Sequence, residues 1–182
     1  KQNPLYEEDG LCSLDTHYYG GIKKYQWLSM PLALHGVVVK TNGTTVSISV
    51  GEADDEPVLG ISDLLAHLSK DQMEKKAGAL IEGESMDVLV GSRPLEGEEK
   101  QPVKANILKL LKEKYDIEEK DFLSAELELV PAGRARDFGL DGSMIMGYGH
   151  DDRCCAFAAF EALMGFTGVP CRTLCAILTD KE

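Results

Sequence analysis

The sequence predicts a mixed α/β protein built from two consecutive units. In the first unit, short alternating strands and glycine-containing turns predominate, and residues 44–50 form the clearest strand pattern. In the second, a helix at 152–164 is followed by a strand at 171–179, which is the order of a βαβ-like unit. We therefore expect a β-rich α+β domain over residues 1–131 and part of an α/β domain over residues 132–182.

The first fifty residues contain the strongest turn signals. Residues 1–15 are polar and include proline and glycine, so we expect an irregular segment there. The aromatic group at 17–19 is either a ligand-binding cluster or a turn that docks onto the core. Residues 32–40 and 44–50 are expected to pair as a hairpin, with Asn42-Gly43 as a two-residue type I′ turn.

The middle of the chain is expected to hold two helices between strands. Ser62 has the chemistry of an N-cap before three leucines, which predicts a helix from 63 to about 80 that carries His67. Pro102 suits the first turn of a second helix that ends near Tyr115, with solvated lysines on its polar face. The apolar face of this second helix is formed by Val103, Ile107, Leu110 and Leu111. Strands are expected at 57–60, 86–92 and 122–130.

Charge and cysteine content exclude several classes of protein. Nineteen basic against 31 acidic residues give a formal net charge of −12, which repels nucleic acid and anionic membrane surfaces. No apolar run reaches the roughly 18 residues of a membrane span. The five cysteines are odd in number and mostly lie in apolar patterns, which favours reduced core thiols over disulfides. We expect a cytoplasmic protein that binds neither nucleic acid nor membrane.

The stretch 147–153 is the strongest candidate for chemistry. Its glycines permit a sharp turn, the side chains of His150, Asp151 and Asp152 crowd that turn, and an apolar helix follows at once. A further carboxylate, Glu182, follows the last expected strand, and ligands of open α/β sheets collect at the carboxyl ends of strands. The alternative interpretation is that the two aspartates only cap the helix.

These residues resemble the aspartyl aminopeptidase family of zinc exopeptidases. The resemblance is carried by Gly149-His150-Asp151-Asp152-Arg153 and by the segments 16–27, 64–68 and 130–133, and it covers essentially the whole chain. It implies that the chain is a middle segment of a longer protein. A His-x-Asp-Ser-Pro metal motif would precede Lys1, a second Glu would follow Glu182, and further Asp and His ligands would lie beyond it.

The same resemblance implies a role for each candidate residue. Asp151 matches the carboxylate that bridges two zinc ions. Glu182 matches the first Glu of a Glu-Glu pair, and this first Glu takes a proton from the attacking water and passes it to the leaving amine. His67 matches a histidine that reaches a neighbouring subunit's active site and helps hold the substrate's carbonyl oxygen, although a histidine on a helix is usually structural. Asp152 and His150 are expected to hydrogen bond around the metal-binding carboxylate.

Roles for the two units also follow from the resemblance. Residues from about 5 to 131 would form an inserted oligomerisation domain that joins the subunits of a homo-oligomer, and residues 132 to 182 would form part of the catalytic domain. The whole enzyme would remove acidic or neutral N-terminal residues from peptides. The alternative is that this chain serves assembly alone, because most of the metal ligands are absent from it.

Overall fold

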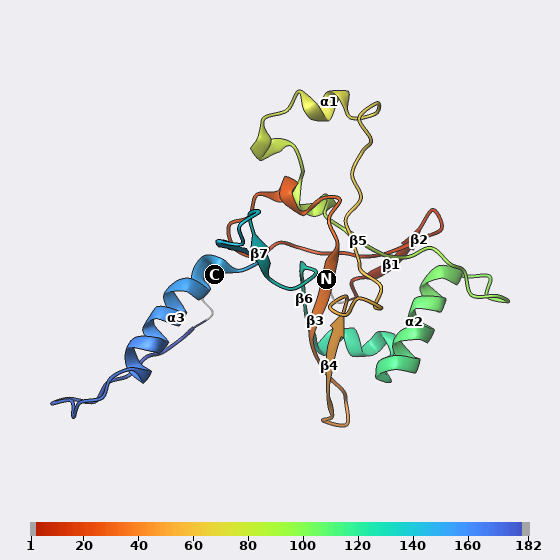
Figure 1. Ribbon diagram of the computed structural model, residues 1–182. Coiled ribbons are helices and arrows are strands. Elements are labelled where there is room, and N and C mark those ends of the chain that lie inside the picture. Colours follow the sequence, from red (N-terminus) through yellow and green to blue (C-terminus); the bar gives the residue numbers. More distant parts are fainter. Residues whose placement is uncertain (1–2, 180–182) are drawn as a thin grey trace. The chain divides into compact units, whose positions relative to one another are not determined.

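The computed structural model describes residues 3–179 and divides into two compact units. Unit 1 ends at Gly133 and unit 2 begins at Arg134. Small antiparallel sheets and helices make up both units (Figure 1), so the predicted mixed α/β class is confirmed. Unit 1 contains β1 (Leu5–Glu8), β2 (Leu11–Leu14), η1 (Lys24–Trp27), β3 (Leu32–Val39), β4 (Thr45–Val50), α1 (Lys70–Met73), η2 (Ala77–Ala79), η3 (Gly83–Ser85), β5 (Val88–Gly91), α2 (Pro102–Tyr115), η4 (Glu119–Ser124) and β6 (Ala125–Pro131), where η denotes a short 3-10 helix.

The first sheet has the strand order β1-β2-β5 and corrects one expectation from the sequence. Residues 1–15 were expected to be irregular, but within them β1 and β2 form an antiparallel hairpin that pairs Leu5 with Leu14. Its turn is Asp9-Gly10, and both residues have positive φ, +49° and +76°. Two consecutive positive φ angles define the type I′ turn, which matches the twist of the flanking strands.

The second sheet has the order β4-β3-β6, and both neighbours run antiparallel to β3. The predicted hairpin of β3 and β4 is confirmed, but its turn type is not. Only Gly43 of the Asn42-Gly43 pair has a positive φ, +83°, and its N–H donates to the Lys40 carbonyl. This is a type I turn with a glycine bulge rather than a type I′ turn. The predicted strands at 86–92 and 122–130 correspond to β5 and β6, with η4 before β6.

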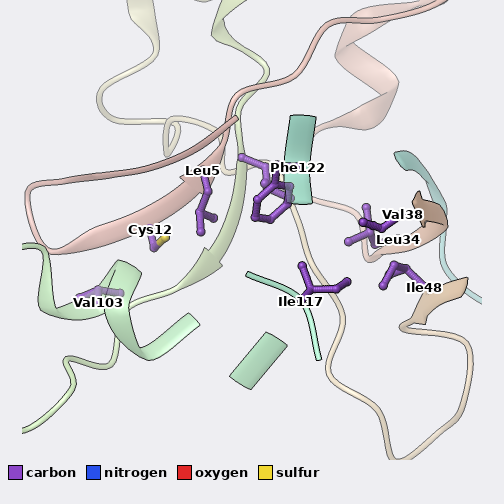
Figure 2. Close-up of a cluster of buried hydrophobic side chains, with 9 residues drawn as sticks. Leu5, Cys12, Leu34, Val38, Ile48, Val103, Ile117 and Phe122 are labelled. Carbon is purple, nitrogen blue, oxygen red and sulfur yellow. The ribbon is translucent and has the colours of Figure 1, made fainter. Parts of the chain in front are cut away.

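The main core of unit 1 joins the two sheets with α2. Figure 2 shows the buried side chains that form it. They are Leu5, Cys12, Leu14, Leu34, Val38, Ile48, Val103, Ile117 and Phe122. The helix α2, predicted from its periodicity, packs against β1, β2 and β5. Its packed side includes Ile107, Leu108 and Leu111. Leu110, which was also expected on the apolar face, is 51% exposed.

The sequence suggested that the lysines of α2 only face solvent, but several of them form ion pairs. The Lys104 ammonium lies 2.5 Å from the Glu119 carboxylate, and this lysine side chain is only 12% exposed. Lys112 pairs with Asp116 at 2.5 Å, and Lys114 pairs with the carboxylate of Glu56 at 3.1 Å. These ion pairs tie the helix to the loops around it. The more exposed pair of Lys112 and Asp116 contributes no more than about 1 kcal/mol to stability.

The predicted helix from 63 to about 80 is wrong. In the segment 62–85, which we call the His67 segment, α-helix is confined to α1 and residues 66–68 form a turn. Leu64, Leu65 and Leu68 are 54%, 56% and 68% exposed. Helices in proteins gain most of their stability by burying an apolar face, and no surface of unit 1 covers these leucines. The segment appears in Figure 1 as the yellow excursion that includes α1.

Unit 2 contains β7 (Arg136–Phe138), β8 (Met144–Met146) and α3 (His150–Met164), which is blue in Figure 1. The strands β7 and β8 form an antiparallel pair. The predicted helix at 152–164 is confirmed, but the predicted strand is wrong because residues 171–179 form no strand. A strand needs hydrogen-bonding neighbours, and the described part of unit 2 offers only the short pair β7-β8.

The apolar side chains of unit 2 are largely exposed. Phe157 is 64% exposed and Met164 is 66% exposed, although the sequence around them suggested a buried helix. Of the five cysteines, which all have free thiols, only Cys12 of unit 1 is buried. The expectation of core thiols is therefore wrong for Cys154, Cys155, Cys171 and Cys175. No helix within residues 3–179 is long and apolar enough to cross a membrane.

Candidate functional site

The two candidate aspartates occupy an extended bend at the start of α3. Asp151 has φ −88° and ψ 112°, and Asp152 has φ −114° and ψ 25°, so neither residue is helical and the regular helix begins at Arg153. The peptide bond between the two aspartates is cis. Gly149, which precedes the first turn, provides no side-chain cap. Helix capping by the two aspartates stays an alternative prediction.

Glycines shape the turn that precedes the aspartates. Gly149 has φ +77°, a left-handed conformation that side chains rarely adopt. Gly147 lies close to another part of unit 2, because a Cβ atom on it would come 3.0 Å from the Cβ atom of Ala135. The Arg153 guanidinium donates a hydrogen bond of 2.9 Å to the Tyr148 carbonyl and so closes the turn. The backbone thus presents the two carboxylates on a constrained bend.

Polar contacts surround the bend without involving Asp151 directly. A hydrogen bond from the Cys155 thiol to the Asp152 carboxylate, followed by the charge of that carboxylate, raises the pKa of Cys155. The Cys154 sulfur lies 3.8 Å from Nδ1 of His150. Both contacts join residues three and four apart in the sequence, which are neighbours on a helix, so this spacing was the signal that could have indicated them. All five residues are exposed, so their carboxylate, imidazole and thiol groups are accessible.

The donor set of the described residues fits a metal only in part. A carboxylate such as Asp151 is a suitable ligand for zinc. However, residues 3–179 contain no group of three or more His, Cys, Asp or Glu side chains that could hold a metal ion. A catalytic zinc ion normally has about three protein ligands. Glu182 lies outside the described residues, so the structure does not place it.

His67 lies in unit 1, on the turn at 66–68, and not on a helix as expected. Its side chain is exposed and makes no hydrogen bond or ion pair within the described residues. The turn is braced locally, because the Leu68 N–H donates to the Leu65 carbonyl and the Ser69 hydroxyl donates to the Ala66 carbonyl. A surface hollow beside it is lined partly by Leu28, Leu64 and Leu68. The histidine therefore lies exposed on a turn that is stabilised by local hydrogen bonds.

Comparison with known proteins assigns the chain to a class, the zinc metallopeptidases. The family model described as "Aminopeptidase I zinc metalloprotease (M18)" matches residues 1–182, and the chain belongs to this family. A "Probable M18 family aminopeptidase 1" from Clostridium acetobutylicum is 61% identical over 183 residues. That alignment covers 100% of this chain and 39% of the relative.

Solved structures agree with this assignment. The crystal structure of an M18 family aminopeptidase from Thermotoga maritima matches with a TM-score of 0.85 and 49% identity, over 90% of this chain and 36% of that one. The crystal structure of aminopeptidase I from Clostridium acetobutylicum matches with a TM-score of 0.84 and 62% identity, over 92% and 37% of the two chains. The chain thus spans well under half the length of the relatives it matches.

Proposed function

We propose that the whole protein that contains this chain is an aminopeptidase that removes N-terminal residues, acidic or neutral, from peptides. The observation that carries the proposal is the family match along residues 1–182, together with the constrained bend that presents Asp151. In this proposal, unit 2 belongs to the catalytic domain and unit 1 is the inserted domain through which subunits associate. The protein would act in the cytoplasm.

Asp151 is the residue of this chain proposed to hold metal. Zinc, when bound, would polarise the peptide carbonyl and activate the attacking water. Two metal ions bridged by the Asp151 carboxylate are proposed, and the remaining ligands would come from parts of the whole protein outside this chain. His150, which precedes Asp151, would orient its carboxylate by donating a hydrogen bond, and Asp152, which follows it, would accept hydrogen bonds from other groups beside the metal site.

Two further residues have proposed roles in moving or balancing charge. Glu182 would accept a proton from the attacking water and pass it to the leaving amine, which is ordinary general acid–base chemistry for a carboxylate. His67 would donate a hydrogen bond to the oxyanion that forms from the peptide carbonyl in a neighbouring subunit. Its exposed position on an outward turn, without a partner in the described residues, supports a role in contact with another molecule.

A second candidate function is assembly without chemistry in the chain as given. The exposed leucines of the His67 segment favour it, together with Met73, which is 72% exposed. Exposed apolar clusters mark sites of association. The two functions are compatible in the whole protein, where the proposal is a homo-oligomer whose subunits act on peptides. They differ for the isolated chain, which could associate but would lack most of the metal ligands.

Substitution of Asp151 tests the metal role directly. In the whole protein, Asp151→Ala should abolish turnover and lower the zinc content per subunit, because the bridging carboxylate is lost, while oligomer size stays unchanged. Glu96→Ala, which removes an exposed loop carboxylate of unit 1, serves as the control and should leave all three quantities unchanged. If Asp151→Ala retained both turnover and zinc, the metal assignment would be wrong.

A further inference from the structure

The two ends of the His67 segment are fixed by the core of unit 1. Ile61, just before the segment, is 5% exposed, and its carbonyl accepts a hydrogen bond of 2.9 Å from the Ser29 N–H. Met86, just after it, is 4% exposed, and its carbonyl accepts a hydrogen bond of 2.6 Å from the Thr16 hydroxyl. Both residues belong to a second buried cluster that also contains Leu32 and Val88. Both ends of the His67 segment are therefore anchored in the buried core of unit 1.

Between these ends the segment is braced mainly by its own residues. The Gln72 side-chain amide donates to the Asp63 carboxylate over 3.0 Å, in addition to the local bonds of the turn at 66–68. Most side chains from 62 to 79 are exposed. The part that carries His67 is thus held together internally but has few contacts with the sheets, so its orientation depends on the contacts near its two ends.

One such contact involves the aromatic group at 17–19 and lies within the last turn of the segment. The ring of Tyr18 packs onto Gly83 so closely that a Cβ atom on Gly83 would come 2.9 Å from Cδ1 of the ring and closer still to Cε1. Only glycine allows the ring to lie there without displacement. The Lys24 ammonium lies over the same ring, 5.7 Å from its centroid, which is within the range of a cation–π contact.

The Tyr18 ring is not a core side chain, since it is 47% exposed. The buried clusters of unit 1 do not include it. Its loss would therefore leave the two sheets and their cores intact while releasing the His67 segment near Gly83. Tyr19 provides an internal comparison, because this neighbouring tyrosine is 64% exposed.

We propose that Tyr18 is a positioning residue, whose ring against Gly83 sets the orientation of the segment that presents His67 to substrate. The inference rests on the proposed function of His67 as a donor to the oxyanion. Donors of this kind act only when their geometry is close to that of the transition state, and a misplacement of about 1 Å can cost roughly 100-fold in rate. Tyr18 would act on turnover through His67, without touching substrate itself.

The test compares variants of the full-length, metal-loaded protein. Tyr18→Ala should lower kcat roughly 10- to 100-fold with a smaller change in KM, whereas Tyr18→Phe, which keeps the ring, and Tyr19→Ala should leave kcat unchanged. In a His67→Ala background, Tyr18→Ala should cause no further loss, because both substitutions remove the same contribution. An unchanged kcat in Tyr18→Ala, or an undiminished loss in the His67→Ala background, would overturn the proposal.

A second readout does not depend on activity. Tyr18→Ala should speed hydrogen exchange of the backbone amides within residues 62–85, leave the exchange of β3 and β4 unchanged, and preserve zinc content and oligomer size. Gly83→Ala, which forces the ring away, should reproduce the effect in the presence of Tyr18 and add nothing in Tyr18→Ala. Unchanged exchange in Tyr18→Ala would show that the ring does not hold the segment. If His67→Ala alone kept full turnover, the oxyanion role of His67 would fail, and exchange would still decide whether Tyr18 holds the segment.

Discussion

The two units differ in where their apolar side chains lie. In unit 1, the side chains of Leu32 and Val38 are 0% and 1% exposed and belong to clusters that join several strands. In unit 2, Phe157 and Met164 are about as apolar but 64% and 66% exposed. Among residues 3–179, every side chain of the buried hydrophobic core lies in unit 1, and the aspartates of the candidate metal site lie in unit 2.

This difference indicates which parts of the fold are complete within the chain. Unit 1 has sheets, a covering helix and cores of its own. The helix α3 is apolar on several sides, a pattern typical of helices that are surrounded by other elements. Since the relatives are more than twice as long as this chain, we propose that residues from elsewhere in the whole protein cover α3 and complete the metal site.

The largest expected effect separates the chain from the whole protein. The isolated 182-residue chain, supplied with zinc, should show no aminopeptidase turnover, because Asp151 and Glu182 alone cannot hold two metals. The full-length protein under the same conditions should be active. Metal-dependent turnover by the purified chain, after exclusion of contaminating peptidases, would contradict the proposal that the metal site of unit 2 is completed by residues outside this chain.

A smaller effect is expected from truncating one apolar side chain in each unit. In the 182-residue chain, Leu32→Ala should lower the free energy of unfolding by about 2–5 kcal/mol, because it opens a cavity in a buried cluster. Phe157→Ala should change it by no more than about 0.5 kcal/mol, since the ring is exposed. Denaturant unfolding followed by fluorescence can measure both, because Trp27, the single tryptophan, packs against the Leu32 cluster.

The two substitutions, Leu32→Ala and Phe157→Ala, should also be compared in the whole protein. There, Phe157→Ala should lower the melting temperature clearly, because α3 is expected to be covered. If Phe157→Ala were as costly as Leu32→Ala in the isolated chain, unit 2 would have a core of its own and the contrast would be wrong.

The smallest expected effect is a pH dependence of stability that arises from Glu56 in unit 1. The Lys114 ammonium, and then backbone N–H groups led by Ala53, hold the pKa of Glu56 at about 2, below its usual 4.5. Because the folded-state pKa is the lower one, this stabilisation is present above pH 4.5 and is lost as the pH falls from 4.5 towards 2. Glu56→Gln should therefore flatten the acid-side fall of the melting temperature of the 182-residue chain. Glu96→Gln, at an exposed loop carboxylate, is the control and should leave that fall unchanged.

Two hairpin turns show how far local sequence determines structure. A type I′ turn was expected at Asn42-Gly43, but the turn there contains a glycine bulge. The turn at Asp9-Gly10, for which no type was predicted, is of type I′. Both dipeptides are typical of tight turns, so the β1-β2 hairpin could have been predicted from the signal that indicated β3-β4. The turn types could not, because strand register, which is set by long-range pairing, decides how many residues the turn must span.

The two predicted helices of unit 1 show the limit of periodicity. Both carried apolar residues at helical spacing after a suitable first residue, but only α2 has sheets to pack against. The His67 segment lacks such a surface, and the helix predicted there is reduced to α1. Packing against the sheets therefore determined which of the two predicted helices formed, and a single sequence does not reveal such packing.

The candidate site was predicted in part. The bend at Asp151 follows from its glycines and from the helix after it, and the structure shows this bend with non-helical angles at both aspartates. The metal roles of Asp151 and Glu182 and the oxyanion role of His67 stay predictions. The contact between Tyr18 and Gly83 joins positions far apart in sequence, so no local pattern could have indicated it.

The most direct test of the proposed mechanism mixes two inactive forms of the full-length protein. His67→Ala should lower turnover by roughly 10²–10³-fold through loss of one oxyanion donor, and Asp151→Ala should abolish turnover through loss of metal. Reassembled together, the two forms can pair an intact His67 of one subunit with an intact Asp151 of its neighbour. Activity should then partly return, while each variant reassembled alone stays at its own low level. No recovery, in assemblies shown by mass to be mixed, would contradict an active site shared between subunits.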